Sequence, residues 1–143
     1  MKRVILLGLI GFVLTGCEEK KVTEDMLIGE WECDIDYQIA KMRNGIDQDY
    51  APQVGQAVLF VKYLKKDDQL FVEFTDSDGE IIQDFKELNG GFNYSIGDRK
   101  IDGFRKLEYI TNNEFKSIYE SSKTQDKSED KEKTKILMHC TRI

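Results

Sequence analysis

Apolar and polar residues alternate one by one over residues 30–39. The odd positions carry apolar, aromatic or thiol side chains, namely Trp31, Cys33, Ile35, Tyr37 and Ile39. The even positions carry only acidic or amide side chains. A period of two over this length is typical of a β-strand with one buried and one solvated face. We therefore predict a strand here, with its odd positions pointing into the core.

Short strand patterns then follow one another to the C-terminus. The predicted strands are AVLFVKYL, QLFVEFT, EIIQDFKEL, FNYSI, IDGFRKLEYI, EFKSIYES and KILMHCTRI, separated by turn sequences such as KKDD, DSDG, NGG, GDRK and TNNE. The only predicted helix is a brief turn after Thr23, whose hydroxyl would cap it. Evenly spaced short strands are typical of an antiparallel sandwich or barrel, and eight suit a small closed barrel. We predict an all-β domain over residues 25–143, an eight-stranded antiparallel up-and-down barrel.

Two segments interrupt the alternation. Residues 121–134 carry four basic and four acidic side chains and nothing apolar, so we expect a solvated loop between two strands. Residues 42–56 contain the only proline and are expected to form a second long loop. Long loops in compact domains are often functional, which makes residues 42–56 the candidate partner-binding region. Its charged and aromatic candidates are Arg43, Asp47, Asp49 and Tyr50.

The N-terminus holds a separate apolar run. Lys2 and Arg3 precede residues 4–14, a run that fits the apolar region of a secretory signal and is too short to span a bilayer. The sequence Leu-Thr-Gly-Cys that follows, ending at Cys17, resembles a bacterial lipobox. The resemblance implies removal of residues 1–16, acylation of Cys17 with chains such as palmitate, and a lipidated tether over residues 17–24. With glutamate at position 18, it further implies sorting to the outer membrane, facing the periplasm.

An exported chain places the other two cysteines in an oxidising compartment. Cys33 and Cys140 lie too far apart in the sequence for a zinc-binding pair. Cys33 shares parity with Trp31, and Cys140 with Met138, so both are expected to point inward. The first and last strands of an up-and-down barrel are neighbours. We therefore predict a Cys33–Cys140 disulfide that closes the barrel.

The start of the first strand, Gly29-x-Trp31, resembles the Gly-x-Trp motif of lipocalin-like barrels. In that family the tryptophan closes one end of the barrel and an arginine of the last strand packs over it. The resemblance implies that role for Arg142. It also implies an apolar cavity, whereas barrel size by itself favours an interior filled by its own aromatic side chains. The candidate cavity or core residues are Trp31, Ile35, Tyr37, Phe60, Phe74 and Tyr109.

Charge and the few reactive side chains exclude several functions. The chain has 21 basic and 27 acidic residues, and loss of Lys2 and Arg3 would move the net charge from −6 to −8. An acidic body argues against nucleic acid and suits a basic protein partner. The only histidine, His139, adjoins Cys140 on a predicted strand, so their side chains diverge. We find no motif for a metal, a cofactor or catalysis, and we predict that the protein is not an enzyme.

Three functions remain at this stage. The first is a lipid-anchored periplasmic binding module for a protein, acting as an inhibitor or immunity factor against a hydrolase or a toxin. The second is a lipocalin-type carrier of a small apolar ligand. The third is a structural lipoprotein of the envelope.

Overall fold

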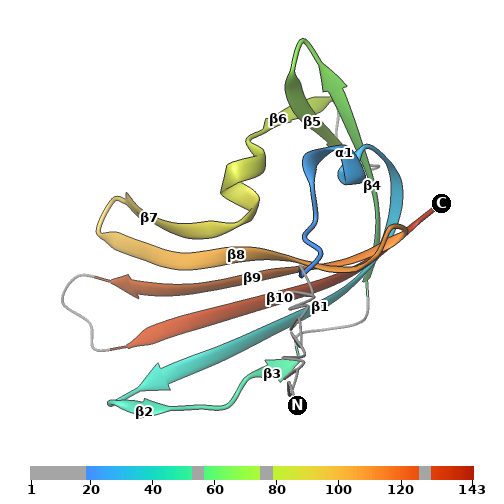
Figure 1. Cartoon of the computed structure of the whole chain (residues 1–143). Coiled ribbons are helices and arrows are strands. Elements are labelled where there is room, and N and C mark those ends of the chain that lie inside the picture. The colour runs from blue at the N-terminus through green and yellow to red at the C-terminus, as the bar shows by residue number, and fades with distance from the viewer. Residues whose placement is uncertain (1–18, 53–56, 75–78, 126–129) are drawn as a thin grey trace, which may run out of the picture.

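The computed structural model describes residues 19–52, 57–74, 79–125 and 130–143 (Figure 1). These residues form an all-β fold around one antiparallel sheet, whose main path is β6-β5-β4-β1-β10-β9-β8-β7. The strands are β1 (Gly29–Arg43), β2 (Ile46–Asp47), β3 (Ala51–Pro52), β4 (Ala57–Lys66), β5 (Gln69–Phe74), β6 (Glu80–Gln83), β7 (Gly90–Ile96), β8 (Arg99–Thr111), β9 (Glu114–Gln125) and β10 (Lys131–Arg142). The short helices are α1 (Glu24–Leu27) and the 3-10 helix η1 (Phe85–Leu88). Neither helix is long enough to cross a membrane.

The first and last long strands lie side by side, as predicted. β1 and β10 pair without a register shift, and Cys33 is directly opposite Cys140. The two sulfur atoms form a disulfide, S–S 2.07 Å. The predicted covalent link between the first and last strands is therefore confirmed.

The sheet is a half-barrel, because β6 and β7 do not pair within the described residues. The predicted strand EIIQDFKEL ends at Gln83, and the backbone turns into η1 instead. Asp84 favours this turn, because its side chain accepts a hydrogen bond from the Lys86 N–H at 2.9 Å. Asn89, just before β7, accepts the Leu107 N–H on its Oδ1 at 2.8 Å. It thereby satisfies a donor of β8 that lies past the end of the β7–β8 pairing, where none of the described strands pairs with it on that side. The sheet thus differs from the closed barrel predicted.

The expected loop over residues 121–134 is mostly strand, which corrects that prediction. β9 extends to Gln125 and β10 begins at Lys131. Opposite charges face each other across this pair, for example Lys123 and Glu132. Cross-strand pairs of opposite charge stabilise a sheet, so these strands form without burying apolar side chains.

The long loop expected over residues 42–56 is also partly strand. β1 continues to Arg43 and turns through Asn44 and Gly45, both with positive φ. Asn-Gly is the preferred pair for a tight hairpin turn of this kind. β2 and β3 then pair with the free edge of β1, while residues 53–56 lie outside the described part.

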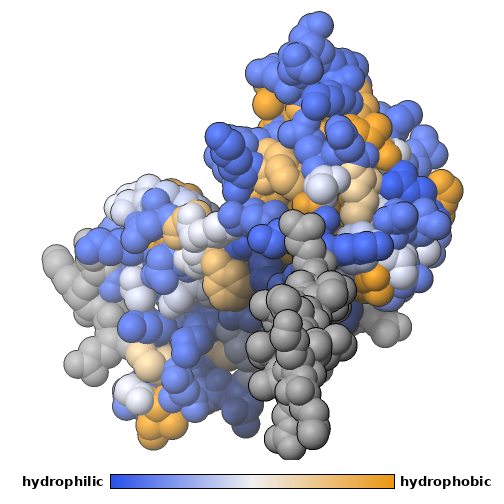
Figure 2. Space-filling model, in the orientation of Figure 1, coloured by the Kyte–Doolittle hydropathy of each residue, from blue (hydrophilic) through white to orange (hydrophobic). Residues whose placement is uncertain are grey.

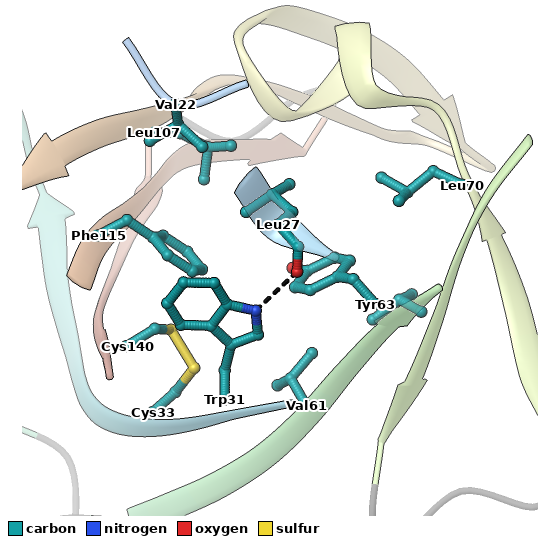
Figure 3. Packing of buried hydrophobic residues seen from close by; sticks show 11 residues of the cluster. Val22, Leu27, Trp31, Cys33, Val61, Tyr63, Leu70, Leu107, Phe115 and Cys140 are labelled. Carbon is teal, nitrogen blue, oxygen red and sulfur yellow. Dashed lines mark hydrogen bonds between the residues drawn. A yellow bond between two sulfur atoms is a disulfide. The ribbon is translucent and has the colours of Figure 1, made fainter. Parts of the chain in front are cut away.

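The core fills one end of the half-barrel (Figure 3). It comprises Val22, Leu27, Trp31, Cys33, Val61, Tyr63, Leu70, Val72, Leu107, Phe115 and Cys140. The Trp31 and Phe115 rings meet edge to face, with centroids 4.8 Å apart. α1 closes this end and begins as predicted, because Thr23 Oγ1 accepts the Met26 N–H at 3.2 Å.

Candidate binding site

The closed end of the half-barrel is built around Trp31, which is fully buried. Its indole Nε1 donates to the Leu27 carbonyl at 2.7 Å. The Arg142 guanidinium lies 4.3 Å from the centroid of the Trp31 ring. It also donates to the Ile28 carbonyl at 2.8 Å and the Met26 carbonyl at 2.6 Å. Arg142 therefore joins the last strand to the end of α1, and it packs over Trp31 as the lipocalin resemblance implies.

Gly29 is required at this end by both its conformation and its neighbour. Its φ is +133°, a value that residues with a Cβ rarely adopt. A Cβ at Gly29 would overlap the guanidinium of Arg142. The Gly-x-Trp pattern therefore has a local physical cause: the glycine makes room for the arginine that covers the tryptophan.

The interior at the closed end is filled by side chains rather than by a ligand space. Trp31, Leu27 and Phe115 are among the largest fully buried side chains. Tyr63 is also buried, and its burial raises the pKa of the phenol to about 12. A neutral phenol therefore persists there to strongly alkaline pH. This end acts as a packed plug.

The other half of the sheet presents a different inner face. The inward positions of β1, β10, β9 and β8 form a row across the sheet, in which Tyr37 is opposite Ile136, Ile136 opposite Tyr119, and Tyr119 opposite Arg105. None of these side chains is buried, and Tyr37 is 37% exposed. We call these four residues, together with Phe92 of β7, the inner-face row.

An arginine and two aromatic rings form the centre of the inner-face row. The rings of Phe92 and Tyr119 stack at 5.4 Å with an interplanar angle of 15°. The Arg105 guanidinium lies 5.5 Å from the Phe92 centroid and 5.7 Å from that of Tyr119. A Cβ on Gly103 would fall 2.7 Å from the Phe92 ring, so this strand glycine makes the stack possible.

Arg105 is well placed to meet a ligand. Within the described part of the chain Arg105 makes no ion pair with a carboxylate, and its guanidinium lies against the rings of Phe92 and Tyr119. An arginine on aromatic faces offers its five N–H donors in a fixed plane to an incoming carboxylate or carbonyl. The inner-face row therefore combines apolar area with a positioned cation.

Hydrophobic area alone does not single out this site. On the surface shown in Figure 2, hydrophobic residues form small separate patches among hydrophilic ones. On the outer face, Asp34, Asp36, Lys116, Ile118, Leu137 and His139 are among the residues that line a shallow hollow of about 300 Å³. His139 is exposed there, and its Nε2 lies 3.9 Å from Glu114. Within the described ranges, no three His, Cys, Asp or Glu side chains are grouped to hold a metal ion.

The predicted loop residues lie on the exposed surface near the far end of β1. Asp47 pairs with Lys133 of β10 at 3.2 Å. Tyr50 is 38% exposed, and Asp49 precedes it between β2 and β3. Arg43 helps line a hollow of about 260 Å³ at the ends of β1, β9 and β10, to which Asp49 and Tyr50 do not contribute. The four side chains are accessible but do not form one cluster of hydrogen bonds or ion pairs.

The predicted cavity residues divide between the plug and the open half. Trp31 is in the plug, and Phe74 and Tyr109 pack against it. Ile35 is half-buried between the plug and Tyr37 of the inner-face row. The prediction that Phe60 lines a cavity or the core is wrong. Its side chain is 43% exposed on the outer face, opposite Glu32.

The alternation of inward and outward positions along β4 explains why Phe60 lies on the outer face. The same alternation along β8 could have identified part of the inner-face row from the sequence. On β4 the buried residues are Val61 and Tyr63, so the even positions point outward. On β8 the buried Leu107 gives the inward parity to Gly103 and Arg105. The glycine inside a strand pattern was the available signal, because such a glycine often marks a close approach.

The segment that follows the predicted lipidation site contacts the body through Val22 and Lys20. Cys17 itself lies outside the described residues. Val22 is buried against the core, and Lys20 Nζ lies 5.8 Å from the Tyr109 ring. Together with Lys106 and Phe85, residues 19–22 help line a hollow of about 710 Å³ beside β8.

The fold and site define an antiparallel half-barrel with a disulfide between its first and last strands, a plugged end and an open aromatic inner face. Comparisons with protein-family models, with curated proteins and with solved structures found no match for this chain.

Proposed function

We propose that this protein is a lipid-anchored envelope protein of the bacterial outer membrane that acts as a non-enzymatic binding module for a protein partner. The observation that carries the proposal is the inner-face row. Half-exposed aromatic side chains lie together on the inner face of the sheet with Arg105, which makes no ion pair with any carboxylate of the described residues. Aromatic residues and arginine are the side chains that contribute most to protein–protein binding energy.

The open shape of the sheet favours a protein over a small molecule. The plug fills the end of the half-barrel where an enclosed cavity would lie. Beyond the plug, the side chains of the inner-face row are not buried. A chain segment of a partner protein would fit on such an open inner face. The expected net charge of −8 favours a partner with a basic surface at long range, such as a cell-wall hydrolase or a toxin that the module would inhibit.

The lipid anchor would hold the domain close to the membrane. The proposal rests on the lipobox, whose cysteine is three residues before Lys20. Three residues span at most about 11 Å, and the chain is held to the core two residues further on, where Val22 is buried. The inner face would then be presented at a short and fixed distance from the bilayer.

A substitution in the inner-face row tests the binding function. We expect Tyr37→Asp to reduce capture of the partner from an envelope extract at least about tenfold, because it places a charge in a hot-spot position. The free energy of unfolding should change by less than about 1 kcal/mol, since Tyr37 is already well exposed. The measurement is quantitative mass spectrometry of proteins retained by the immobilised chain, with denaturant unfolding in parallel.

Phe60→Asp is the matched control, because Phe60 is similarly exposed but lies on the outer face. It should retain the partner. Equal capture by wild type and Tyr37→Asp would contradict binding at the inner-face row. Combined replacement of Asp49 and Tyr50 with alanine, measured in the same way, shows whether the loop extends the binding surface.

A carrier of a small ligand is the second candidate, and Arg105 is the observation that favours it. A guanidinium on an apolar face suits a ligand with an apolar body and a carboxylate. Mass spectrometry of protein extracted gently from its membrane tests this candidate and the anchor together. We expect an intact mass that shows residues 1–16 removed and Cys17 acylated. A co-purifying apolar acid, lost in Arg105→Gln, would favour the carrier over the protein-binding module.

A further inference from the structure

The strand β7 is an exposed edge that lacks the usual protection. Among the described residues it pairs only with β8, and it forms the outermost strand on its side of the sheet (Figure 1). Its sequence, GGFNYSI, contains no charged residue and no proline, although charged residues make up 34% of the chain. Natural edge strands are normally protected by charges, proline, bulges or a cover, because free edges pair with other strands.

The strand at the opposite edge of the sheet, β6, is protected against pairing with other strands. β6 has only four residues and begins with Glu80, which is held by Lys66 of β4. β7 is longer, and its pairing with β8 shows no register shift, so it contains no bulge. The contrast makes β7 the edge that is open to another strand.

The turn after β7 determines which of its backbone groups are free. Gly97 and Asp98 form a two-residue turn, with Gly97 at φ +60°, and Ile96 is opposite Arg99. The pair that closes such a turn is hydrogen-bonded, and hydrogen-bonded pairs alternate along an antiparallel ladder. The even residues of β7 therefore bond to β8. The odd residues, Gly91, Asn93 and Ser95, direct their N–H and C=O groups to the free edge.

We propose that β7 pairs antiparallel with β7 of a second copy of this chain, about a two-fold axis at Asn93. This register places Asn93 opposite Asn93 of the other copy and Gly91 opposite Ser95. All three pairs are of the hydrogen-bonded type, so they form six hydrogen bonds. The two sheets become one continuous sheet.

Self-pairing in this register opposes no like charges and aligns aromatic side chains of the two copies. With no charged residue in the strand, the two-fold axis opposes no like charges, which would otherwise destabilise the pair. Phe92 falls opposite Tyr94 of the other copy. Tyr94 is 45% exposed, and Phe92 already stacks on Tyr119. The aromatic part of the inner-face row would therefore continue across the axis.

The expected contact is small, which fixes the concentration range of the test. A single pair of seven-residue strands lies at the low end of specific interfaces, so we expect a dissociation constant of about 10–100 μM in solution. Attachment to a membrane raises the effective concentration of such pairs. That second point rests on the proposed lipid anchor, whereas the strand pairing itself does not.

Sedimentation velocity of the full chain in mild detergent, from about 1 to about 300 μM, tests the proposal. We expect a monomer–dimer equilibrium. Asn93→Pro removes an outward N–H from each copy without disturbing the ladder to β8, since edge strands tolerate proline at such positions. Losing two hydrogen bonds, each worth roughly a fivefold factor, should raise the dissociation constant at least about 25-fold.

Tyr94→Lys is the second variant, because it leaves the backbone unchanged and places a charge opposite Phe92 of the other copy. It should also shift the protein to monomer. Phe60→Lys, with similar exposure on the outer face, should dimerise like wild type. Monomer at every concentration, or unchanged dimerisation in both β7 variants, would overturn the proposal.

A photo-reactive benzophenone side chain at position 94 identifies the occupant of the edge. We expect a cross-linked product of twice the chain mass, joined near Phe92 of the second copy. Cross-links only to a different protein would assign the edge to that partner and overturn self-pairing. Since the Tyr37→Asp binding test uses a different readout, failure of either proposal can be distinguished from failure of the other.

Discussion

Replacing Cys33 and Cys140 together with alanine is expected to lower the free energy of unfolding by about 5 kcal/mol. The disulfide closes a loop of 107 positions, so it removes a large share of the conformational freedom of the unfolded chain. It also joins β1 to β10 at directly opposite positions, next to the buried Trp31. The measurement is urea unfolding followed by far-UV circular dichroism, which reports the strand content.

Two comparisons distinguish the contribution of the disulfide bond to the free energy of unfolding from that of the cysteine side chains. Wild-type protein under reducing conditions should lose nearly as much stability as the double-alanine variant, because both lack the loop constraint. Cys17→Ser should unfold like wild type, since that sulfur is not part of the pair. A loss below about 1 kcal/mol in the reduced protein would show that the unfolded chain is already constrained without the bond, contrary to the chain-entropy account.

The features that the sequence predicted correctly are those that depend on the contrast between a buried inner face and a solvent-exposed outer face of the sheet. Trp31 and Cys33 are buried because the sheet curves around them, and the acidic residues between them remain on the outside. This burial produces the period of two in the sequence. The inward direction of Cys140 followed in the same way, and the disulfide depended on that direction.

The features that the sequence did not predict are those that depend on pairing rather than burial. Residues 121–124 and 131–134 form strands because both segments pair with a strand on each side, including Lys123 opposite Glu132. Such strands leave no apolar pattern to detect. The predicted closure of the barrel was wrong for a local reason. Asp84 starts a helical turn where the apolar pattern of the segment predicted a strand.

The candidate site was predicted only in part, since it depends on register across several strands. Tyr37 was recognised from the parity of β1. Phe92, Arg105 and Tyr119 come from three separate strands, and their meeting follows from how β7, β8 and β9 align. Single-strand periodicity gives the face of each side chain but not its neighbour on the next strand.

Trp31→Ala is the second substitution with a large expected effect, and it should cost about 4–5 kcal/mol of unfolding free energy. Trp31 is fully buried, packs edge to face on Phe115 and holds the Leu27 carbonyl through its indole N–H. Removing the ring leaves a cavity, an unpaired carbonyl at the end of α1, and Arg142 without its stacking surface. Because Trp31 is the only tryptophan, unfolding must be followed by far-UV circular dichroism rather than by tryptophan fluorescence.

Trp31→Phe divides this loss between the ring and the hydrogen bond. Phenylalanine keeps an aromatic surface for Arg142 but has no N–H for Leu27, so we expect an intermediate cost of about 2 kcal/mol. Phe60→Ala removes an aromatic side chain from the outer face of the adjacent strand β4 and should cost less than about 1 kcal/mol. If Trp31→Ala were as mild as Phe60→Ala, the closed end could not be the packed plug described above, and the interior there would have to be considered as a ligand cavity instead.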